Sequence, residues 1–129
     1  MEYKYQLILL GSDCPEMTHI ISKVIEKIKD LNLPDSIIKF IEANQISSDY
    51  QGNQPAFALY FGDTEGNHKH LDITDKLLKD GTMILPIYFG NPDEGAFSKE
   101  IPCILSNQNG IRYNDNELDR IANIILEAF

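Results

Sequence analysis

Polar residues suited to binding a ligand follow three apolar segments of the chain, each at the point where the segment ends in a glycine. These residues are Gly11, Ser12, Asp13 and Cys14 after the first segment, Gly62, Asp63 and Thr64 after the second, and Asn91 and Asp93 after the third. If the segments are parallel strands, their carboxyl ends meet along one edge of a sheet, and ligands bind in the crevice outside that edge. We therefore predict a ligand-binding site here, although turns and helix caps use the same residue types.

The residues after the first segment argue against a phosphate site. The stretch from Gly11 to Pro15 has one glycine and no Lys or Arg, whereas phosphate sites use free backbone N–H groups in a glycine-rich turn. Asp13 stands three residues before Glu16, which is the spacing of a capping box, and Pro15 suits the first turn of a helix. As the N-cap, Asp13 would occupy those N–H groups and add a negative charge. We expect such a site to favour a neutral sugar or amide over a phosphate.

Two further groups of residues could carry chemistry. His68 and His70 stand two apart, as metal ligands can, but no third ligand is evident, so we expect an exposed polar loop without a metal site. Asp13 would raise the pKa of the neighbouring Cys14, for which we expect a buried, unreactive thiol. Cys14 and Cys103 are predicted to be free thiols. The clustered acids of a phospho-receiver domain are incomplete, because only Asp13 follows the first strand.

The elements that must position these residues alternate between strand and helix patterns. Apolar runs predict strands over 5–11, 36–42, 56–62, 82–89 and, more briefly, 109–113. Apolar residues at helical spacing predict helices from a cap at Asp13 to 31, over 71–78 and over 115–129, with a short helical or extended crossing over 97–104. The polar stretch 43–55 is long for a compact domain and is typical of a binding or mobile loop. This alternation predicts a single α/β domain over 1–129.

The charge of the chain limits its partners. It has 11 basic and 20 acidic residues and a net charge of −9, which repels nucleic acid and anionic membranes. No apolar run approaches the roughly 20 residues that span a bilayer, and the N-terminus lacks the pattern of a secretory signal. We expect a cytoplasmic protein that binds neither nucleic acid nor membranes.

Several phrases, in their order and spacing, resemble those of a bacterial Toll/interleukin-1 receptor (TIR) type domain. The C-terminal half carries Gly81-Thr-Met-Ile-Leu-Pro-Ile-Tyr-Phe89, then Phe97-Ser-Lys-Glu-Ile-Pro-Cys-Ile-Leu105, then Asn109-Gly110. The N-terminal half carries Leu10-Gly-Ser-Asp-Cys-Pro15 and Tyr60-Phe-Gly-Asp63. These phrases are similar to those of a TIR-like module that precedes TIR domains in bacterial immune proteins, and the resemblance covers nearly the whole chain.

The resemblance implies a flavodoxin-like fold, three layers around a mostly parallel sheet of about five strands, and a signalling role in prokaryotic immunity such as anti-phage defence. Catalytic TIR domains cleave NAD with a Glu in the helix after the third strand. Here residues 67–79 contain no Glu; Asp72 is nearest in position, and Glu65 lies in the preceding loop. Because Asp is one methylene shorter, the misplaced carboxylate would cost roughly 10²-fold in rate. The Trp that often accompanies that Glu is also missing.

Three functional hypotheses follow. The first is a non-catalytic TIR-like module that controls an attached or neighbouring effector by self-association or ligand sensing, with itself or another TIR domain as partner and with 43–55 as a contact loop. The second is a divergent NAD nucleosidase that uses Asp72 or Glu65. The third is a module that binds NAD or another nucleotide in the crevice at the strand ends.

Overall fold

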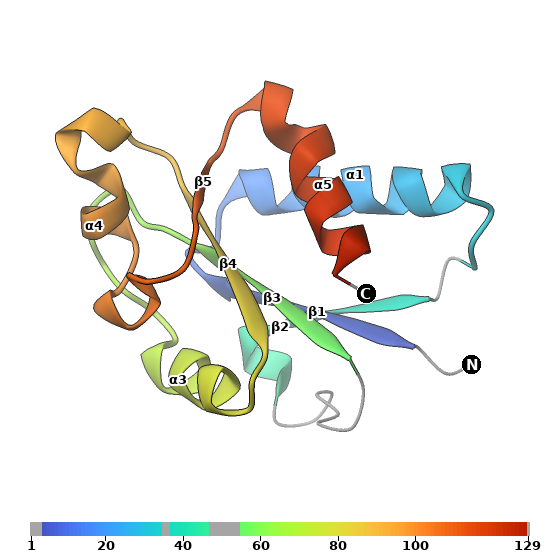
Figure 1. The fold of residues 1–129 in the computed structure, drawn as a ribbon, viewed down its shortest axis with the longest axis horizontal. Helices are drawn as coiled ribbons and strands as arrows, with labels where there is room; N and C mark the ends of the chain where they lie inside the picture. Colours follow the sequence, from blue (N-terminus) through green and yellow to red (C-terminus); the bar gives the residue numbers. More distant parts are fainter. Residues whose placement is uncertain (1–3, 35–36, 47–54, 129) are drawn as a thin grey trace.

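A sheet of five parallel strands, in the order β2-β1-β3-β4-β5, forms the centre of the computed structural model, which describes residues 4–34, 37–46 and 55–128 (Figure 1). The strands are β1 (Tyr5–Gly11), β2 (Ile38–Glu42), β3 (Ala56–Phe61), β4 (Met83–Tyr88) and β5 (Ile111–Arg112). The α-helices are α1 (Pro15–Asp30), α3 (Leu71–Lys79), α4 (Ala96–Glu100) and α5 (Leu118–Glu127). The predicted flavodoxin-like α/β class is confirmed, and every strand pair is parallel.

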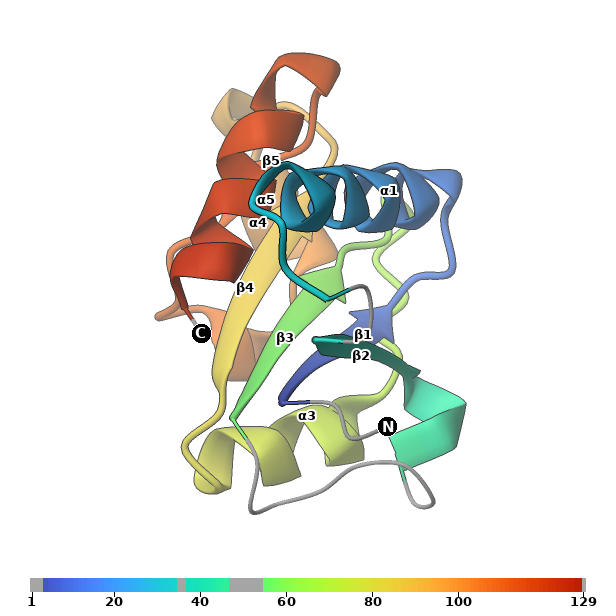
Figure 2. The ribbon, with the colours of Figure 1, turned by 90° about the vertical axis from the view of Figure 1, so that its right-hand side faces the viewer.

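Helices cover both faces of the sheet. α1 and α5 lie together on one face, and α3 lies on the opposite face (Figures 1 and 2). Along β1, Leu7 and Leu9 belong to the core beneath α1 and α5, whereas Ile8 and Leu10 belong to the core that contains Leu77 of α3. Because both faces of β1 are buried, its sequence reads as a continuous apolar run instead of an alternating one.

The chain reverses its direction across the sheet at β1. From β1 it goes to β2 at one edge and then returns past β1 to β3, after which β4 and β5 follow in order. Such a reversal opens a crevice beyond the carboxyl ends of β1 and β3, where flavodoxin-like domains bind ligands. The two strands are very close there: Gly11 has a φ of 85°, and a Cβ at this position would collide with the carbonyl oxygen of Phe61.

The predicted capping box at the start of α1 is wrong. The N-cap is Cys14, with φ −133° and ψ 153°, and no side chain caps the helix; the Met17 N–H donates to the Cys14 carbonyl at 3.2 Å. The reason lies in Pro15, which occupies the first helical position. A proline forces the residue before it into the extended conformation, which is the conformation of an N-cap. The cap therefore falls on Cys14, one residue after Asp13.

Other boundaries differ from the prediction in detail. The strand predicted over 109–113 has only two residues, and the crossing over 97–104 consists of α4 and the 3-10 helix η3 (Cys103–Leu105). The predicted loop 43–55 begins with the 3-10 helix η1 (Ala43–Gln45), while residues 47–54 lie outside the part of the chain that the structure describes. The remaining 3-10 helices are η2 (Pro92–Glu94) and η4 (Asp115–Glu117).

The helix predicted to reach residue 31 ends at Asp30, and Leu31, which caps it, is 60% exposed. Within the described ranges, each helix is too short or too polar to reach from one side of a membrane to the other.

Candidate functional site

A cavity of about 300 Å³ lies beyond the carboxyl ends of β1 and β3, which we call the β1/β3 cavity. Its lining consists of Ser12, Asp13, Cys14, Glu16, Gly62, Asp63, Thr64 and Phe89. Six of these residues are among those that the sequence predicts at this edge, and the structure brings them together from two loops about 50 residues apart. The cavity lies at the point where the strand order reverses, so topology and surface shape nominate the same place.

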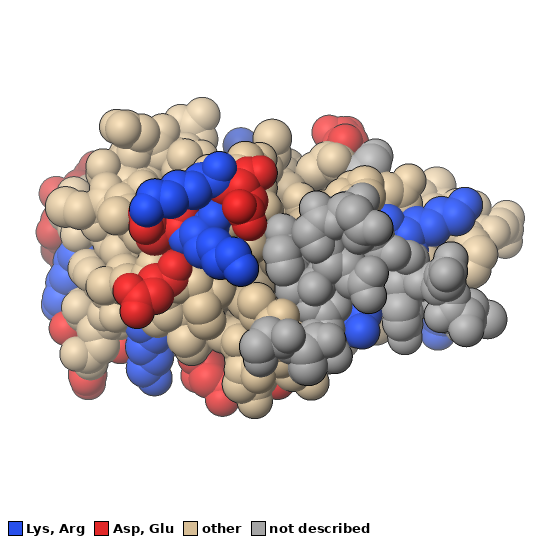
Figure 3. Space-filling view, turned by 90° about the horizontal axis from the view of Figure 1, so that it is seen from below, with Lys and Arg blue, Asp and Glu red and all other residues tan. Residues whose placement is uncertain are grey.

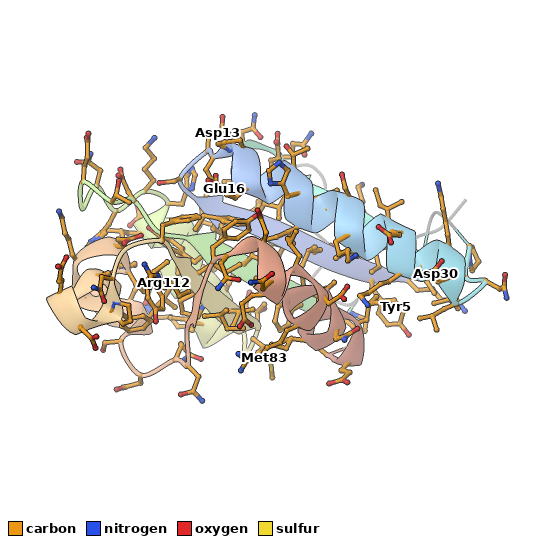
Figure 4. All side chains as sticks on the ribbon, turned by 90° about the horizontal axis from the view of Figure 1, so that it is seen from above. Tyr5, Asp13, Glu16, Asp30, Met83 and Arg112 are labelled. Carbon is orange, nitrogen blue, oxygen red and sulfur yellow. The ribbon has the colours of Figure 1, made fainter. Side chains whose placement is uncertain are left out.

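A second, smaller cavity of about 190 Å³ lies on the other side of the β1 end, towards β2, and we call it the β1/β2 cavity. It is lined by Leu9, Gly11, Asp13, Met17, Glu42, Ala43, Asn44 and His70. Asp13 belongs to both linings, and Figure 4 shows it with Glu16 at the N-terminal end of α1. The exposed carboxylate of Asp13 is therefore placed between the two cavities instead of capping the helix.

The remaining predicted site residues lie elsewhere. Asn91 lines neither cavity; its side chain accepts a hydrogen bond from the Asp93 N–H at 2.9 Å and caps η2. Glu65 and Asp72, the candidate catalytic carboxylates, are exposed and also line neither cavity. The Glu65 N–H donates to Asp63 Oδ1 at 2.8 Å, which shapes the turn after β3.

Acidic side chains dominate the electrostatics of the β1/β3 cavity. Asp13, Glu16 and Asp63 line it, and among the described residues no Lys or Arg belongs to the lining. Such a lining repels phosphate and suits uncharged polar or cationic groups. Burial raises the pKa of the Cys14 thiol to about 11, and the charge of Glu16 acts in the same direction. At neutral pH the thiol therefore stays protonated and weakly nucleophilic. Cys14 is only partly buried, however, and the charge that raises its pKa is that of Glu16 instead of the predicted Asp13.

His70 has a structural role that sequence reasoning missed. The Gly11 N–H donates to its Nδ1 at 3.0 Å, so a residue 59 positions later holds the end of β1. The backbone of His70 is left-handed, with φ 60° and ψ 35°, and forms the N-cap of α3. Its neighbour His68 points elsewhere and contacts the Lys99 carbonyl through Nε2 at 2.9 Å. Among the described residues, no group of three or more potential ligands is placed to hold a metal ion.

Glu100 was also missed, and it explains two of the glycines. The residue is 2% exposed, and its carboxylate accepts hydrogen bonds from the Phe89 and Gly90 N–H groups, both at 2.8 Å. A Cβ at Gly62 would lie 2.7 Å from the Glu100 Cβ, and one at Gly90 would lie 2.8 Å from Oε2. Glycine is therefore needed at both strand ends to admit this side chain. An acidic residue placed directly before the apolar pair Ile101-Pro102 is the only local sign of it.

No family model matches this chain, and no curated protein or solved structure shows significant similarity to it.

Proposed function

We propose that this chain is a non-catalytic, TIR-like signalling module that senses a small uncharged polar ligand in the β1/β3 cavity and controls an attached or neighbouring effector by associating with itself or with another TIR domain. The observation that carries the proposal is the convergence of Ser12–Cys14 and Gly62–Thr64 on one cavity at the reversal of the strand order. The role in immune signalling rests on the resemblance of the sequence to bacterial TIR-like modules.

The size of the cavity supports a small ligand. At about 300 Å³ it is at the lower end of the volumes typical of small-molecule sites, which suits a molecule no larger than a nucleoside. A dinucleotide such as NAD would extend well beyond it.

The chemistry of the lining supports an uncharged ligand. Ser12 and Thr64 offer hydroxyl groups, and Asp13, Glu16 and Asp63 offer carboxylates that accept hydrogen bonds from hydroxyl or amide donors. The same carboxylates repel a phosphate or pyrophosphate group. Of the parts of a nucleotide, the ribose and the base therefore suit this lining better than the phosphates do.

The positions of Asp72 and Glu65 support a non-catalytic module. Asp72 lies in the first turn of α3, a helix that also carries an ion pair between Asp75 Oδ2 and Lys79 Nζ at 2.9 Å. The face of the molecule seen from below mixes acidic and basic side chains (Figure 3). Neither Asp72 nor Glu65 lines the β1/β3 cavity or the β1/β2 cavity. We place the module in the cytoplasm, where free thiols such as Cys14 and Cys103 persist.

The test measures thermal unfolding with matched pairs of ligands: ribose and adenosine against AMP and ATP, and nicotinamide against NAD. We expect a rise in Tm with at least one uncharged member and a smaller or no rise with its phosphorylated counterpart. Asp63→Asn, which keeps a side-chain acceptor for the Glu65 N–H, should reduce the difference in Tm shift between the two ligands of a pair. No shift with any ligand, or equal shifts within each pair, would contradict the proposed ligand class.

Two further measurements test the other parts of the proposal. Sedimentation with and without the stabilising ligand should show an increase in mass with ligand, and a monomer under both conditions would contradict control by self-association. Incubation of concentrated protein with NAD should release no nicotinamide. Release that is abolished by Asp72→Ala or Glu65→Ala would establish the enzymatic alternative instead.

A further inference from the structure

We infer that His70 is a proton-operated latch: its neutral imidazole holds the end of β1 to the start of α3, and protonation of the ring opens this contact. The inference does not depend on what fills the β1/β3 cavity. It rests on the direction of the Gly11 N–H, on the hydrogen-bonding partner of each imidazole and on the backbone conformation of His70.

The first step is the direction of the Gly11 N–H. Along β1, Gln6 and Ser12 donate to carbonyls on the β3 side, at Pro55 and Phe61, whereas Tyr5 donates to Ile37 on the β2 side. Because donors alternate along a strand, the Gly11 N–H points towards β2. The pairing with β2 ends two residues earlier, at Leu9 with Glu42. The imidazole of His70 supplies the acceptor where β2 supplies none.

The second step is the protonation state that this contact requires. A backbone N–H can only donate to a ring nitrogen that has a free lone pair, so Nδ1 is unprotonated and Nε2 carries the hydrogen. Protonation would put a hydrogen on Nδ1 that points at the Gly11 N–H. An attraction would thereby become a repulsion between two donors.

The hydrogen bond of His68 does not depend on a neutral ring, so His68 is a matched control for His70. Its Nε2 contacts the Lys99 carbonyl at 2.9 Å, and an acceptor of this kind requires a hydrogen on that nitrogen. A second proton on the His68 ring would leave this bond in place. The two imidazoles are separated by a single residue, yet only the His70 contact depends on a neutral ring.

The charged groups around the His70 ring determine where the ring would move after protonation. Burial and, next, the charge of Lys69 lower the pKa of His70 below its usual value, which favours the closed latch at neutral pH. Among the described residues, Asp13 from the β1–α1 loop and Glu42 from the end of β2 line the cavity that His70 also lines. Asp72 lies two residues further on, in the first turn of α3. Once charged and released, the ring would be attracted to Asp13 and Glu42.

The backbone of His70 is in an unfavourable conformation, and neighbouring hydrogen bonds limit which part of the chain would move on protonation. A left-handed conformation such as that of His70 is unfavourable for a residue with a side chain, and the Gly11 contact helps to hold it. The preceding Lys69 carbonyl stays fixed by the Tyr60 hydroxyl at 2.7 Å, and the His70 carbonyl accepts from Thr74 Oγ1 at 2.7 Å. Opening is therefore confined to the β1 end and the β1/β2 cavity.

The direct test is an NMR titration of the ring nitrogens of His70 and of the Gly11 amide, from about pH 7.5 to about pH 5, the range in which imidazole titrates. We expect the Nε2–H tautomer at neutral pH, and one shared midpoint for His70 and Gly11 below about 6.5, the ordinary value for histidine. A hydrogen on Nδ1 at neutral pH, or a Gly11 amide that does not respond to pH, would overturn the inference.

The matched variants are His70→Asn and His68→Asn. Asn tolerates the left-handed conformation and places an oxygen near the position of Nδ1, so it keeps an acceptor that does not titrate. Because the folded-state pKa of His70 is lowered, its contribution to stability is complete above about pH 6.5 and declines as pH falls. The Tm of the wild type should therefore fall by a few degrees relative to His70→Asn on acidification.

His68→Asn should keep the pH response of the wild type. If His70→Asn and the wild type lose stability in parallel as the pH falls, the inference is wrong. If His70→Asn does not fold, the titration of the wild-type protein decides the matter by itself.

Discussion

At the ends of β1 and β4, side chains of different kinds accept hydrogen bonds from backbone N–H groups. Gly11 lies beyond the last β1 residue paired with β2, and Phe89 and Gly90 lie beyond the last paired residue of β4. Each end receives a side chain from a distant element: His70 at Gly11, and Glu100 at Phe89 and Gly90. Glu100 is buried and accepts two hydrogen bonds, whereas His70 is exposed and accepts one. We therefore expect the β4 end to stay closed, whereas the β1 end borders two cavities and is where we propose a response to a ligand or a proton.

The largest loss of stability should come from removing the Glu100 side chain at the end of β4. Glu100→Ala leaves two partly buried N–H groups without this acceptor and removes a buried side chain, and we expect a loss of about 2 to 5 kcal/mol in the free energy of unfolding, measured with urea. Glu100→Gln should be intermediate, because an amide offers one oxygen where the carboxylate offers two. A loss below about 1 kcal/mol for Glu100→Ala would show that the contact does not hold the β4 end.

A glycine pair measures how tightly β1 and β3 approach each other. Gly11 and Gly81 have nearly the same φ, 85° and 83°, but a Cβ at Gly11 would collide with β3, while one at Gly81 meets open space. Gly81→Ala should cost about 1 to 2 kcal/mol for the backbone alone. Gly11→Ala should cost about 2 kcal/mol more, because the strands must separate. Equal costs in urea unfolding would mean that the β1 end is looser than the structure shows.

Substitution of a residue that lines the β1/β3 cavity should change the stability of the protein little. Asp63 is partly exposed, and Asp63→Asn preserves an acceptor for the Glu65 N–H, so we expect a change in stability of about 0.5 kcal/mol or less. Ligand preference should change instead, because one of three carboxylates is lost. A loss comparable to that of Glu100→Ala would make Asp63 part of the framework and remove the contrast between the two strand ends.

The smallest loss of stability is expected for a substitution far from both strand ends, at Asp119. Lys23 and Lys27 of α1 lie 3.2 and 3.4 Å from Asp119 of α5, and hydrogen bonding to Lys23 and then Lys27 lowers the pKa of this carboxyl. Its contribution should therefore be present at neutral pH and fade only as the pH falls below about 3.9, the ordinary value for Asp. Asp119→Asn should lower Tm slightly at low salt and not at about 1 M salt, where exposed charges are screened.

Much of the fold could be predicted because its causes are local. Apolar runs and helical spacing define the strands and helices, and parallel topology then places Ser12–Cys14 beside Gly62–Thr64 without further information. The spacing of Asp13 and Glu16 predicts a start of α1 one residue too early, because the restriction that Pro15 places on Cys14 determines the N-cap instead.

The contacts at the strand ends could not be predicted in this way. His70 reaches Gly11 across 59 residues, and Glu100 reaches Phe89 across 11, and both contacts depend on how far each strand extends beyond its neighbour. The glycines at the ends of the apolar runs mark the strand ends in the sequence, but the sequence does not show what they accommodate. In the structure, Gly62 and Gly90 accommodate Glu100, and Gly11 accommodates β3.

The proposed site between β1 and β3 is tested most directly by a map of backbone amide shifts on adding adenosine, ribose or nicotinamide to the folded protein. We expect at least one of them to shift the amides of Ser12, Asp13 and Gly62–Thr64, while those of Pro92–Gly95 that carry an N–H stay unchanged. Shifts centred on Asp72, or none with any of these ligands, would contradict a sensing site between β1 and β3.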